Sequence, residues 1–227
     1  MTQRKNRKHY TRRSVSGGLA VCLAAGAVSR AGTLAQPSTP AQVEGPFYPL
    51  DSESERDTDL TLIEGHAAPA TGEQILVRGI IRNTQGGALP NATVELWQAN
   101  SAGRYKHPAD PNPAPLDAHF QGGGIMTTSA EGSYGFKTVK PGPYPLGPMG
   151  ASGWRCRHIH FKIACPGYRA LTTQMYFEGD PLIAQDLVIA GAPRDTRHLL
   201  IAKAETDASG LPLYRFDIIL ASGDAAG

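Results

Sequence analysis

Two histidines separated by one residue, His158 and His160, are the clearest local signal of chemistry in this 227-residue chain. Polar and apolar residues alternate around them, which predicts a β-strand. On a strand, residues i and i+2 point to the same face about 6.6 Å apart along the chain, so both imidazoles could bind one metal ion. The alternative is an amphipathic strand with two surface histidines, because an HxH pair is also common by chance.

Two tyrosines favour the metal hypothesis. Tyr144 lies in a Pro-Gly-Pro-Tyr-Pro segment, where prolines restrict the backbone, and Tyr105 follows a predicted strand. Each alone is typical of packing or of a turn, but with His158 and His160 they supply two phenol oxygens and two imidazole nitrogens. Phenolate is a hard anionic donor that suits Fe(III), which would also deprotonate phenols that ionise near pH ~10 when free. Zinc prefers cysteine or carboxylate beside histidine, and the cysteines here are not placed for it.

The elements that must position these residues are short strands. Gly and Pro, 26 and 18 residues, are too frequent for a helical bundle, and a hydrophobic content of 41% is enough for a core. Strand-like segments are Ile75–Arg82, Thr93–Trp97, Ser133–Thr138, Arg157–Ile163, Thr172–Phe177 and Tyr214–Leu220, and Asp186–Ala190 is a candidate short helix. The pattern predicts an all-β protein, a β-sandwich or a barrel, with long loops and an irregular N-terminal arm. Of these we expect the sandwich of two sheets, which would resemble prealbumin.

Residues 1–35 are typical of an export signal. They carry seven basic and no acidic residues, and the pair Arg12-Arg13 precedes a weakly apolar stretch over 14–29. This pattern resembles a twin-arginine signal, which exports folded proteins, so we expect cleavage after Ala35 and a periplasmic location. A transmembrane anchor is the alternative, but the apolar run is too short and too rich in glycine to span about 30 Å of hydrocarbon.

The three cysteines favour neither a lipid anchor nor a disulfide. Lipidation at Cys22 is disfavoured because Val21 is bulky where a small residue is expected. If Cys22 leaves with the signal, Cys156 and Cys165 remain, and the strand predicted between them would hold them roughly 30 Å apart. A disulfide allows only about 7 Å between Cα atoms, so we expect two free thiols.

The rest of the chain divides into an arm and one domain. Residues 36–73 are rich in Pro, Ser, Asp and Glu and show no sustained period, whereas residues 74–227 contain all the predicted strands and form the predicted catalytic domain. Without residues 1–35 the net charge is −5, which argues against a nucleic-acid partner. The chain contains no P-loop, no dinucleotide-binding fingerprint and no internal repeat.

A family resemblance rests on several motifs that occur in order along the chain. They are EGPFYP at 44–49, VELWQAN continuing to GRY at 94–105, KPGPYP at 140–145, WR followed by HIHF at 154–161, and QMYFEGDP at 174–181. Together they resemble the intradiol ring-cleaving dioxygenases from about Gly45 to Leu220, and within that family most closely the iron-bearing β chain of protocatechuate 3,4-dioxygenases.

The resemblance implies a cofactor, a substrate class and a reaction. It implies a non-haem Fe(III) held by Tyr105, Tyr144, His158 and His160, with Tyr144 and His160 axial. The substrate would be a catechol-type aromatic, cleaved with O2 between its two hydroxyl-bearing carbons to a cis,cis-muconate-type dicarboxylate. We expect a substrate that carries a polar substituent on the catechol ring, with protocatechuate as the first candidate. Catechol and hydroxyquinol are the alternatives. The arm of about 38 irregular residues lacks room for the helical segment of catechol-type members.

The resemblance also implies roles outside the ligand set. Arg155 matches an arginine beside the bound substrate, where a fixed cation would stabilise developing negative charge, and Tyr144 would accept a substrate proton. A structural salt bridge is the alternative for Arg155. Gln174 matches a glutamine behind the ligands and Tyr48 a tyrosine that lines the substrate cavity. A homo-oligomer, or pairing with an iron-free related chain, is expected.

Some residues depart from the family pattern. Leu146 stands where the β chains carry tryptophan, and Cys156-Arg157 replaces a Pro-Ala pair, which adds a charge beside the site. A second class of protein also fits part of the chain: Ile75–Phe136 resembles an exported transthyretin-like binding sandwich without catalysis. Such a module has no need of two tyrosines and two histidines in one place.

Overall fold

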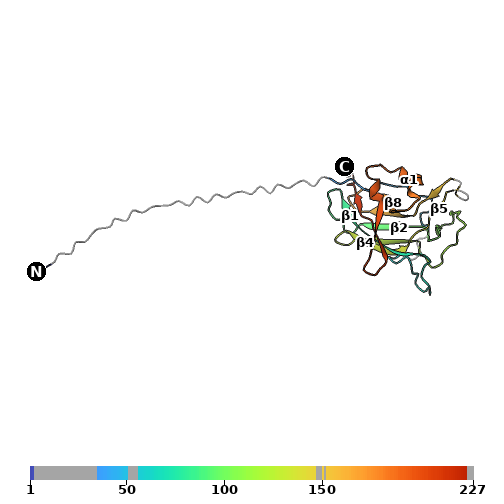
Figure 1. The fold of residues 1–227 in the computed structure, drawn as a ribbon, viewed down its shortest axis with the longest axis horizontal. Helices are drawn as coiled ribbons and strands as arrows, with labels where there is room; N and C mark the ends of the chain where they lie inside the picture. Colours follow the sequence, from blue (N-terminus) through green and yellow to red (C-terminus); the bar gives the residue numbers. More distant parts are fainter. Residues whose placement is uncertain (3–34, 51–55, 147–149, 151, 224–227) are drawn as a thin grey trace. The chain divides into compact units, whose positions relative to one another are not determined.

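The computed structural model describes residues 1–2, 35–50, 56–146, 150 and 152–223 (Figure 1). The predicted export signal lies almost entirely outside these residues, as does Cys22, so cleavage after Ala35 stays a prediction. No helix within the described ranges is long and apolar enough to cross a membrane.

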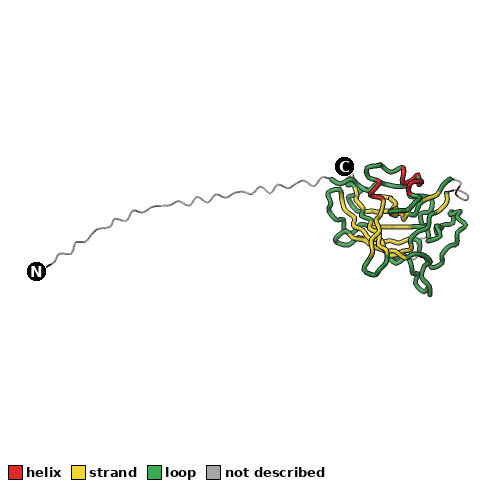
Figure 2. Tube along the Cα trace, in the orientation of Figure 1, coloured by secondary structure: helices red, strands yellow, loops and turns green. Residues whose placement is uncertain are grey.

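The described chain is built mainly of strands and loops, with very little helix (Figure 2). The strands are β1 (Gln74–Asn83), β2 (Thr93–Trp97), β3 (Gly123–Thr127), β4 (Ser133–Val139), β5 (Tyr144–Pro145), β6 (Trp154–Arg155), β7 (His158–Ala164), β8 (Leu171–Phe177), β9 (Ile201–Thr206), β10 (Pro212–Arg215) and β11 (Ile218–Leu220). The helical turns are η2 (Ile183–Gln185), α1 (Leu187–Ala190) and η3 (Arg197–Leu200). The all-β prediction is confirmed.

Strand pairing joins nine of the strands in one continuous sheet. Its order is β11-β1-β10-β9-β8-β7-β2-β3, with β4 also paired to β1, while β5 and β6 form a separate two-stranded sheet. The short parallel contact of β8 with β9, Tyr176 opposite Ile201, links the two halves. The pairing therefore does not divide the strands into the two separate sheets expected from the sequence.

The predicted segment Tyr214–Leu220 is two strands rather than one. Both β10 and β11 pair with β1 in parallel and in the same register, but the pairing is interrupted at Phe216 and Asp217. At this interruption Phe216 donates its backbone N–H to the carbonyl of Arg78. A Cβ atom at Gly79 would lie 1.8 Å from the carbonyl oxygen of Phe216, so only glycine allows this approach.

The two faces of strand β7 carry different kinds of side chain. Ile159, Phe161 and Ile163 are fully buried in the main core, where the Phe161 ring lies 6.0 Å from that of Phe136 on β4. The opposite face carries His158 and His160, each only 2% exposed. The alternative of two surface histidines is therefore wrong, because aromatic side chains such as Trp97 and Tyr144 pack against this face.

The described part of the N-terminal arm packs along the sheet. The backbone N–H of Thr39 donates to the carbonyl of Ile219 at 2.9 Å, and that of Gln42 to the carbonyl of Thr172 at 2.9 Å. Leu60, further along the arm, is completely buried in the main core. The arm thus belongs to the same compact unit as the strands, and its predicted boundary falls at the start of β1.

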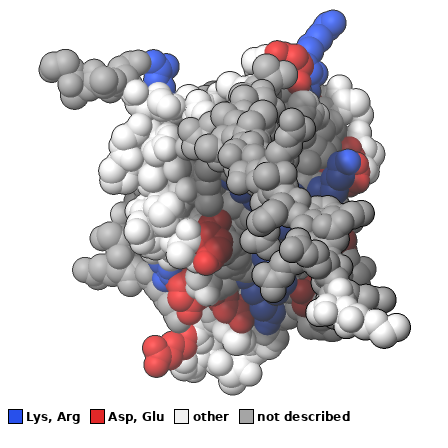
Figure 3. All heavy atoms as spheres, turned by 90° about the vertical axis from the view of Figure 1, so that its left-hand side faces the viewer, with Lys and Arg blue, Asp and Glu red and all other residues white. Residues whose placement is uncertain are grey.

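Acidic and basic side chains lie interspersed on the face drawn in Figure 3. Ion pairs of the described residues include Arg78 with Asp207 at 2.8 Å and Arg215 with Glu205 at 3.4 Å. On the coloured part of this face, the two signs do not separate into large patches.

Candidate active site

The two histidines lie next to a tryptophan on the neighbouring strand. In the pairing of β2 with β7, Trp97 is opposite His160, and the indole and imidazole stack with centroids 4.7 Å apart and planes at 8°. The rings of His158 and His160 are 4.9 Å apart. The strand alternation that predicted a shared face therefore brings the two imidazoles together.

The two tyrosines reach the same place from different loops. Tyr144 is on β5 and pairs with Arg155 on β6, and its ring lies 5.5 Å from that of His158. Tyr105 follows β2, and its ring lies 5.5 Å from Tyr144 and 6.1 Å from His160. All four side chains are at least 94% buried, so the structure gathers two phenols and two imidazoles in one enclosed cluster.

Hydrogen bonds orient the imidazole of His158. Its Nδ1 lies 2.7 Å from the carbonyl oxygen of Cys156, which can only accept, so Nδ1 is the donor. The lone pair of a neutral ring is then on Nε2, which lies 3.3 Å from the hydroxyl of Tyr105. A backbone acceptor on the far nitrogen is the usual arrangement behind a metal-binding histidine.

Burial sets the charge state of the cluster. It lowers the pKa of His158 and His160 well below the ordinary range, and the nearby Arg155 lowers both further. Burial raises the pKa of Tyr105 well above its usual value, and raises that of Tyr144, for which the Arg155 guanidinium partly offsets the effect. The protein alone therefore holds neutral rings, and ionised phenols need a compensating cation.

The donor set fits a hard, highly charged metal ion. Phenolate oxygen with imidazole nitrogen is a mixed set suited to iron. Nδ1 of His160 is buried without a hydrogen-bond partner, so no hydrogen bond at this nitrogen fixes the tautomer of the ring. Within the described ranges no group of three or more His, Cys, Asp or Glu residues could hold a metal ion.

Arg155 is buried at the edge of the cluster, 4% exposed, and donates to three acceptors. Its Nε bonds to Asp186 Oδ2 at 2.8 Å, one terminal nitrogen to Tyr144 Oη at 3.3 Å and the other to Gln174 Oε1 at 2.6 Å. The guanidinium is thus held rigidly against the phenol. It forms a buried salt bridge with Asp186 and also contacts the phenol of Tyr144.

Asp186 is the residue that sequence reasoning missed. It was expected only as the start of a short helix, and its Oδ1 does cap α1 by accepting from the backbone of Val188 at 2.9 Å. Its Oδ2 accepts from Arg155 and from both the backbone N–H and the thiol of Cys156. Its position before a short apolar run was an N-cap signal, but nothing local in the sequence pointed to Arg155.

The residues that depart from the family pattern are accommodated by their neighbours in the structure. Both Cys156 and Cys165 are free, as predicted. The extra charge of Arg157 is directed to Asp180, whose carboxylate also accepts the backbone N–H of Arg157 at 3.0 Å. Leu146 packs beside Tyr144 in a small apolar cluster.

Gln174 and Tyr48 occupy different positions around the cluster. Gln174 is fully buried and accepts from Arg155 and from Tyr176 Oη, while its Nε2 donates to the carbonyl of Val43 in the arm. Tyr48 packs edge-on against Trp97 at 5.0 Å, and its hydroxyl donates to a carboxylate, 2.9 Å from Glu95 Oε1. Its neighbour Phe47 lies against the ring of Tyr105 at 4.9 Å.

Replacing Asp186 by alanine is expected to lower the free energy of unfolding by about 3–5 kcal/mol, because it leaves a buried guanidinium without its carboxylate. Guanidinium chloride titration measures this. Glu205→Ala is the matched control, since the Glu205–Arg215 pair is about half exposed and is worth at most about 1 kcal/mol. Equal losses in both variants would contradict the assigned importance of the buried pair.

Comparison with known proteins identifies the class. A family model described as dioxygenase matches residues 43–222. The chain is 42% identical over 184 residues to the protocatechuate 3,4-dioxygenase beta chain of Burkholderia cepacia, covering 79% of this chain and 78% of that one. It is 34% identical over 209 residues to a hydroxyquinol 1,2-dioxygenase of Corynebacterium glutamicum, covering 82% of this chain and 64% of that protein.

Solved structures agree. The dioxygenase domain of a dioxygenase carbohydrate-binding protein fusion from Streptomyces sp. SirexAA-E matches with a TM-score of 0.60 at 27% identity, covering 82% of this chain and all of that one. Catechol 1,2-dioxygenase of Acinetobacter radioresistens matches with a TM-score of 0.65 at 26% identity, covering 84% of this chain and 65% of that chain. The chain belongs to the intradiol ring-cleaving dioxygenases. The non-catalytic binding module is not favoured.

Proposed function

We propose that the protein is a ferric intradiol dioxygenase for a catechol that carries a polar substituent, with protocatechuate as the first candidate. The observation that carries the proposal is the enclosed cluster of Tyr105, Tyr144, His158 and His160 beside the buried Arg155. The 42% identity to a protocatechuate 3,4-dioxygenase beta chain supports the substrate. Catechol and hydroxyquinol are the alternatives within the same family.

The four rings of the cluster would hold the iron through two phenolate oxygens and two imidazole nitrogens. A ferric ion supplies Lewis acidity toward the two adjacent oxygens of a catechol and draws electron density out of the ring. The carbonyl of Cys156 keeps the lone pair of His158 on Nε2, where a metal ligand requires it.

Two side chains next to the ligands would act on the substrate. Tyr144 would accept a catechol proton at its Oη, which is general-base work. Arg155 lies 3.3 Å from that oxygen and would stabilise negative charge as it develops on the substrate. Because Asp186 and Gln174 already hold the guanidinium, little reorganisation is needed during the reaction.

Apolar and aromatic side chains would keep water out of the reaction. Phe47, Trp97 and Leu146 pack with the two tyrosines in one cluster. Tyr48 lies at the outer side of this cluster and is proposed to line the approach for substrate, and Gln174 to act through Arg155 rather than by contact.

Incubation with protocatechuate, catechol and hydroxyquinol tests the reaction. We expect a product that has gained both atoms of one O2 and absorbs only in the ultraviolet, because cleavage lies between the two hydroxyl-bearing carbons. Mass and absorption spectra identify it. A yellow semialdehyde, the product of cleavage at the adjacent bond, would overturn the mechanism, and turnover of catechol alone would overturn the choice of substrate.

We propose further that the continuous sheet is folded into a two-layer sandwich. Phe161 of β7 contacts Phe136 of β4 and Phe216, although neither neighbours β7 in the sheet order. Such contacts support two layers that face each other. The proposed division is an arm over 36–73 and a catalytic domain over 74–227.

The oligomeric state and the cellular location of the protein are also proposals. We propose a homo-oligomer, or pairing with an iron-free related chain, since the beta-chain name of one relative implies a partner for that relative. Light scattering tests this, and an active monomer would contradict it. Export by a cleaved signal over residues 1–35 rests on the basic pair Arg12-Arg13, and N-terminal sequencing of the secreted protein tests it.

A further inference from the structure

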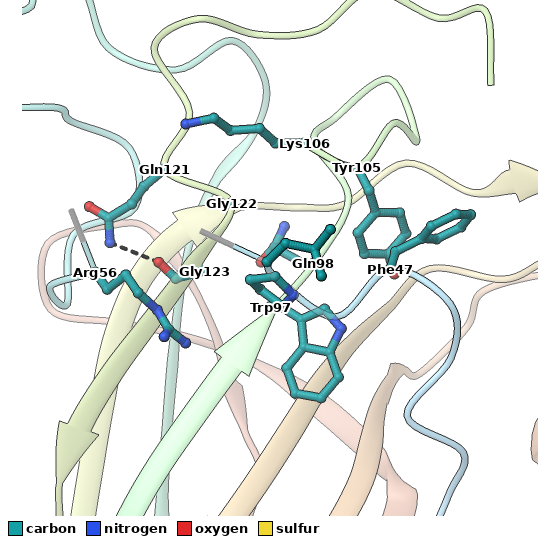
Figure 4. Close-up of a pocket in the computed structure, with 11 residues that line it drawn as sticks. Phe47, Arg56, Trp97, Gln98, Tyr105, Lys106, Gln121, Gly122 and Gly123 are labelled. Carbon is teal, nitrogen blue, oxygen red and sulfur yellow. Dashed lines mark hydrogen bonds between the residues drawn. The ribbon is translucent and has the colours of Figure 1, made fainter. Parts of the chain in front are cut away.

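A pocket adjoins the candidate active site through Tyr105. The ring of Tyr105 lines the pocket, whereas its hydroxyl lies 3.3 Å from His158 Nε2. Figure 4 shows Tyr105 and Phe47 at one end and Arg56 and Gln121 at the other, with Trp97 between them. The pocket therefore shares Phe47, Trp97 and Tyr105 with the apolar cluster around the candidate site.

Polar atoms without partners concentrate around this pocket. Six side-chain nitrogen or oxygen atoms of the described residues are buried without a hydrogen-bond partner. Three of them, Arg56 Nε, Trp97 Nε1 and Gln121 Oε1, belong to residues that line the pocket. Arg56 Nε and Trp97 Nε1 are donors, whereas Gln121 Oε1 is an acceptor. Because an unpaired buried donor is unfavourable, a ligand acceptor that reaches the two donors would bind with a gain in free energy.

The pocket is also cationic. Arg56 and Lys106 are the only charged residues among the described residues that line it. Arg56 donates through one terminal nitrogen to Glu95, which also accepts from Tyr48, so the salt bridge holds the guanidinium in place while its Nε has no partner. Lys106 follows Tyr105 directly and is exposed, which adds a second positive charge at the rim.

We propose that this pocket binds a carboxylate substituent of the aromatic substrate and that Arg56 is the residue that determines this specificity. An ionised carboxylate only accepts hydrogen bonds, and the pocket offers mainly donors, from Arg56, Lys106 and the indole of Trp97. A guanidinium matches a carboxylate in both charge and geometry. A neutral hydroxyl substituent would not gain this charge-assisted pairing. The proposal rests on the proposed function for the position of the substrate ring.

The test compares substrates with and without the carboxylate. For Arg56→Gln we expect kcat/KM for 3,4-dihydroxybenzoate to fall roughly tenfold or more, while that for catechol stays within about threefold. Lys106→Gln should lower the same ratio by a smaller factor, because the ammonium is exposed. Lys203→Gln removes an exposed charge on β9, away from the pocket residues, and should leave the ratio unchanged.

Calorimetry gives a readout that does not need turnover. 4-Hydroxybenzoate should bind the unmodified protein and bind Arg56→Gln roughly tenfold more weakly, while the affinity of phenol is equal for both. Equal losses with and without the carboxylate would show a merely structural Arg56 and overturn the inference, as would no loss at all. If the protein holds no iron and cleaves no ring, the proposed function is overturned instead. The calorimetric comparison would still show whether the pocket binds a carboxylate through Arg56.

Discussion

Replacing Arg155 by alanine is expected to lower kcat by about 10²–10³-fold while iron stays bound. A fixed cation or donor aimed at developing charge contributes about 3–4 kcal/mol in sites of this kind. Arg155 meets the requirement, since it is buried and held by Asp186 and Gln174 with one nitrogen 3.3 Å from Tyr144 Oη. Steady-state kinetics with the preferred catechol and iron analysis of the same sample measure both parts.

The control for Arg155 is its neighbour in sequence, Arg157. Its guanidinium is about one third exposed and pairs with Asp180 rather than with a side chain of the cluster. Arg157→Ala should therefore keep kcat within about threefold of the unmodified enzyme. If kcat of Arg155→Ala stays within tenfold of the unmodified value, Arg155 serves only as a structural salt bridge. If that variant loses its iron, Arg155 acts by holding the metal ligands in place and not on the substrate.

Replacing both Tyr105 and Tyr144 by phenylalanine is expected to abolish turnover and to remove the visible absorption of the iron-bound protein. The iron-bound enzyme should be red-brown from charge transfer between tyrosinate and ferric iron, and this absorption requires the two phenol oxygens. Each single variant should lose part of the absorption, and Tyr144→Phe should keep some iron because three ligands remain. Visible spectroscopy and metal analysis of the purified variants measure this.

The matched control is Tyr134→Phe. Tyr134 is also a buried tyrosine, but its hydroxyl donates to the backbone carbonyl of Phe216 in the core. Its loss should change stability and leave both colour and turnover intact. Absorption that survives in the double variant at Tyr105 and Tyr144, or a colourless zinc protein, would refute the ligand assignment.

Local patterns were sufficient to predict most of the elements that position the site. Alternation around His158 and His160 predicted β7 and its shared histidine face, because side-chain direction on a strand depends only on position. Thr93–Trp97 was predicted with the bounds that β2 has in the structure. Strands β3, β5, β6 and β9 were missed. Strands β5 and β6 have two residues each, and GGIMT and IAKAET contain glycines and alanines, which have low strand propensity, so these segments form strands only by pairing with neighbours.

The sequence by itself determined the all-β class, the two histidines on one strand face and the four residues proposed as ligands. Only the tertiary structure decided which partners hold them. Arg155 meets Asp186, which is 31 residues away, and Gln174 meets Val43 across 131 residues. Likewise the pocket of Arg56, Trp97 and Gln121 joins three distant segments. Such contacts depend on how loops and strands pack around one core, and no local spacing in the chain records that packing.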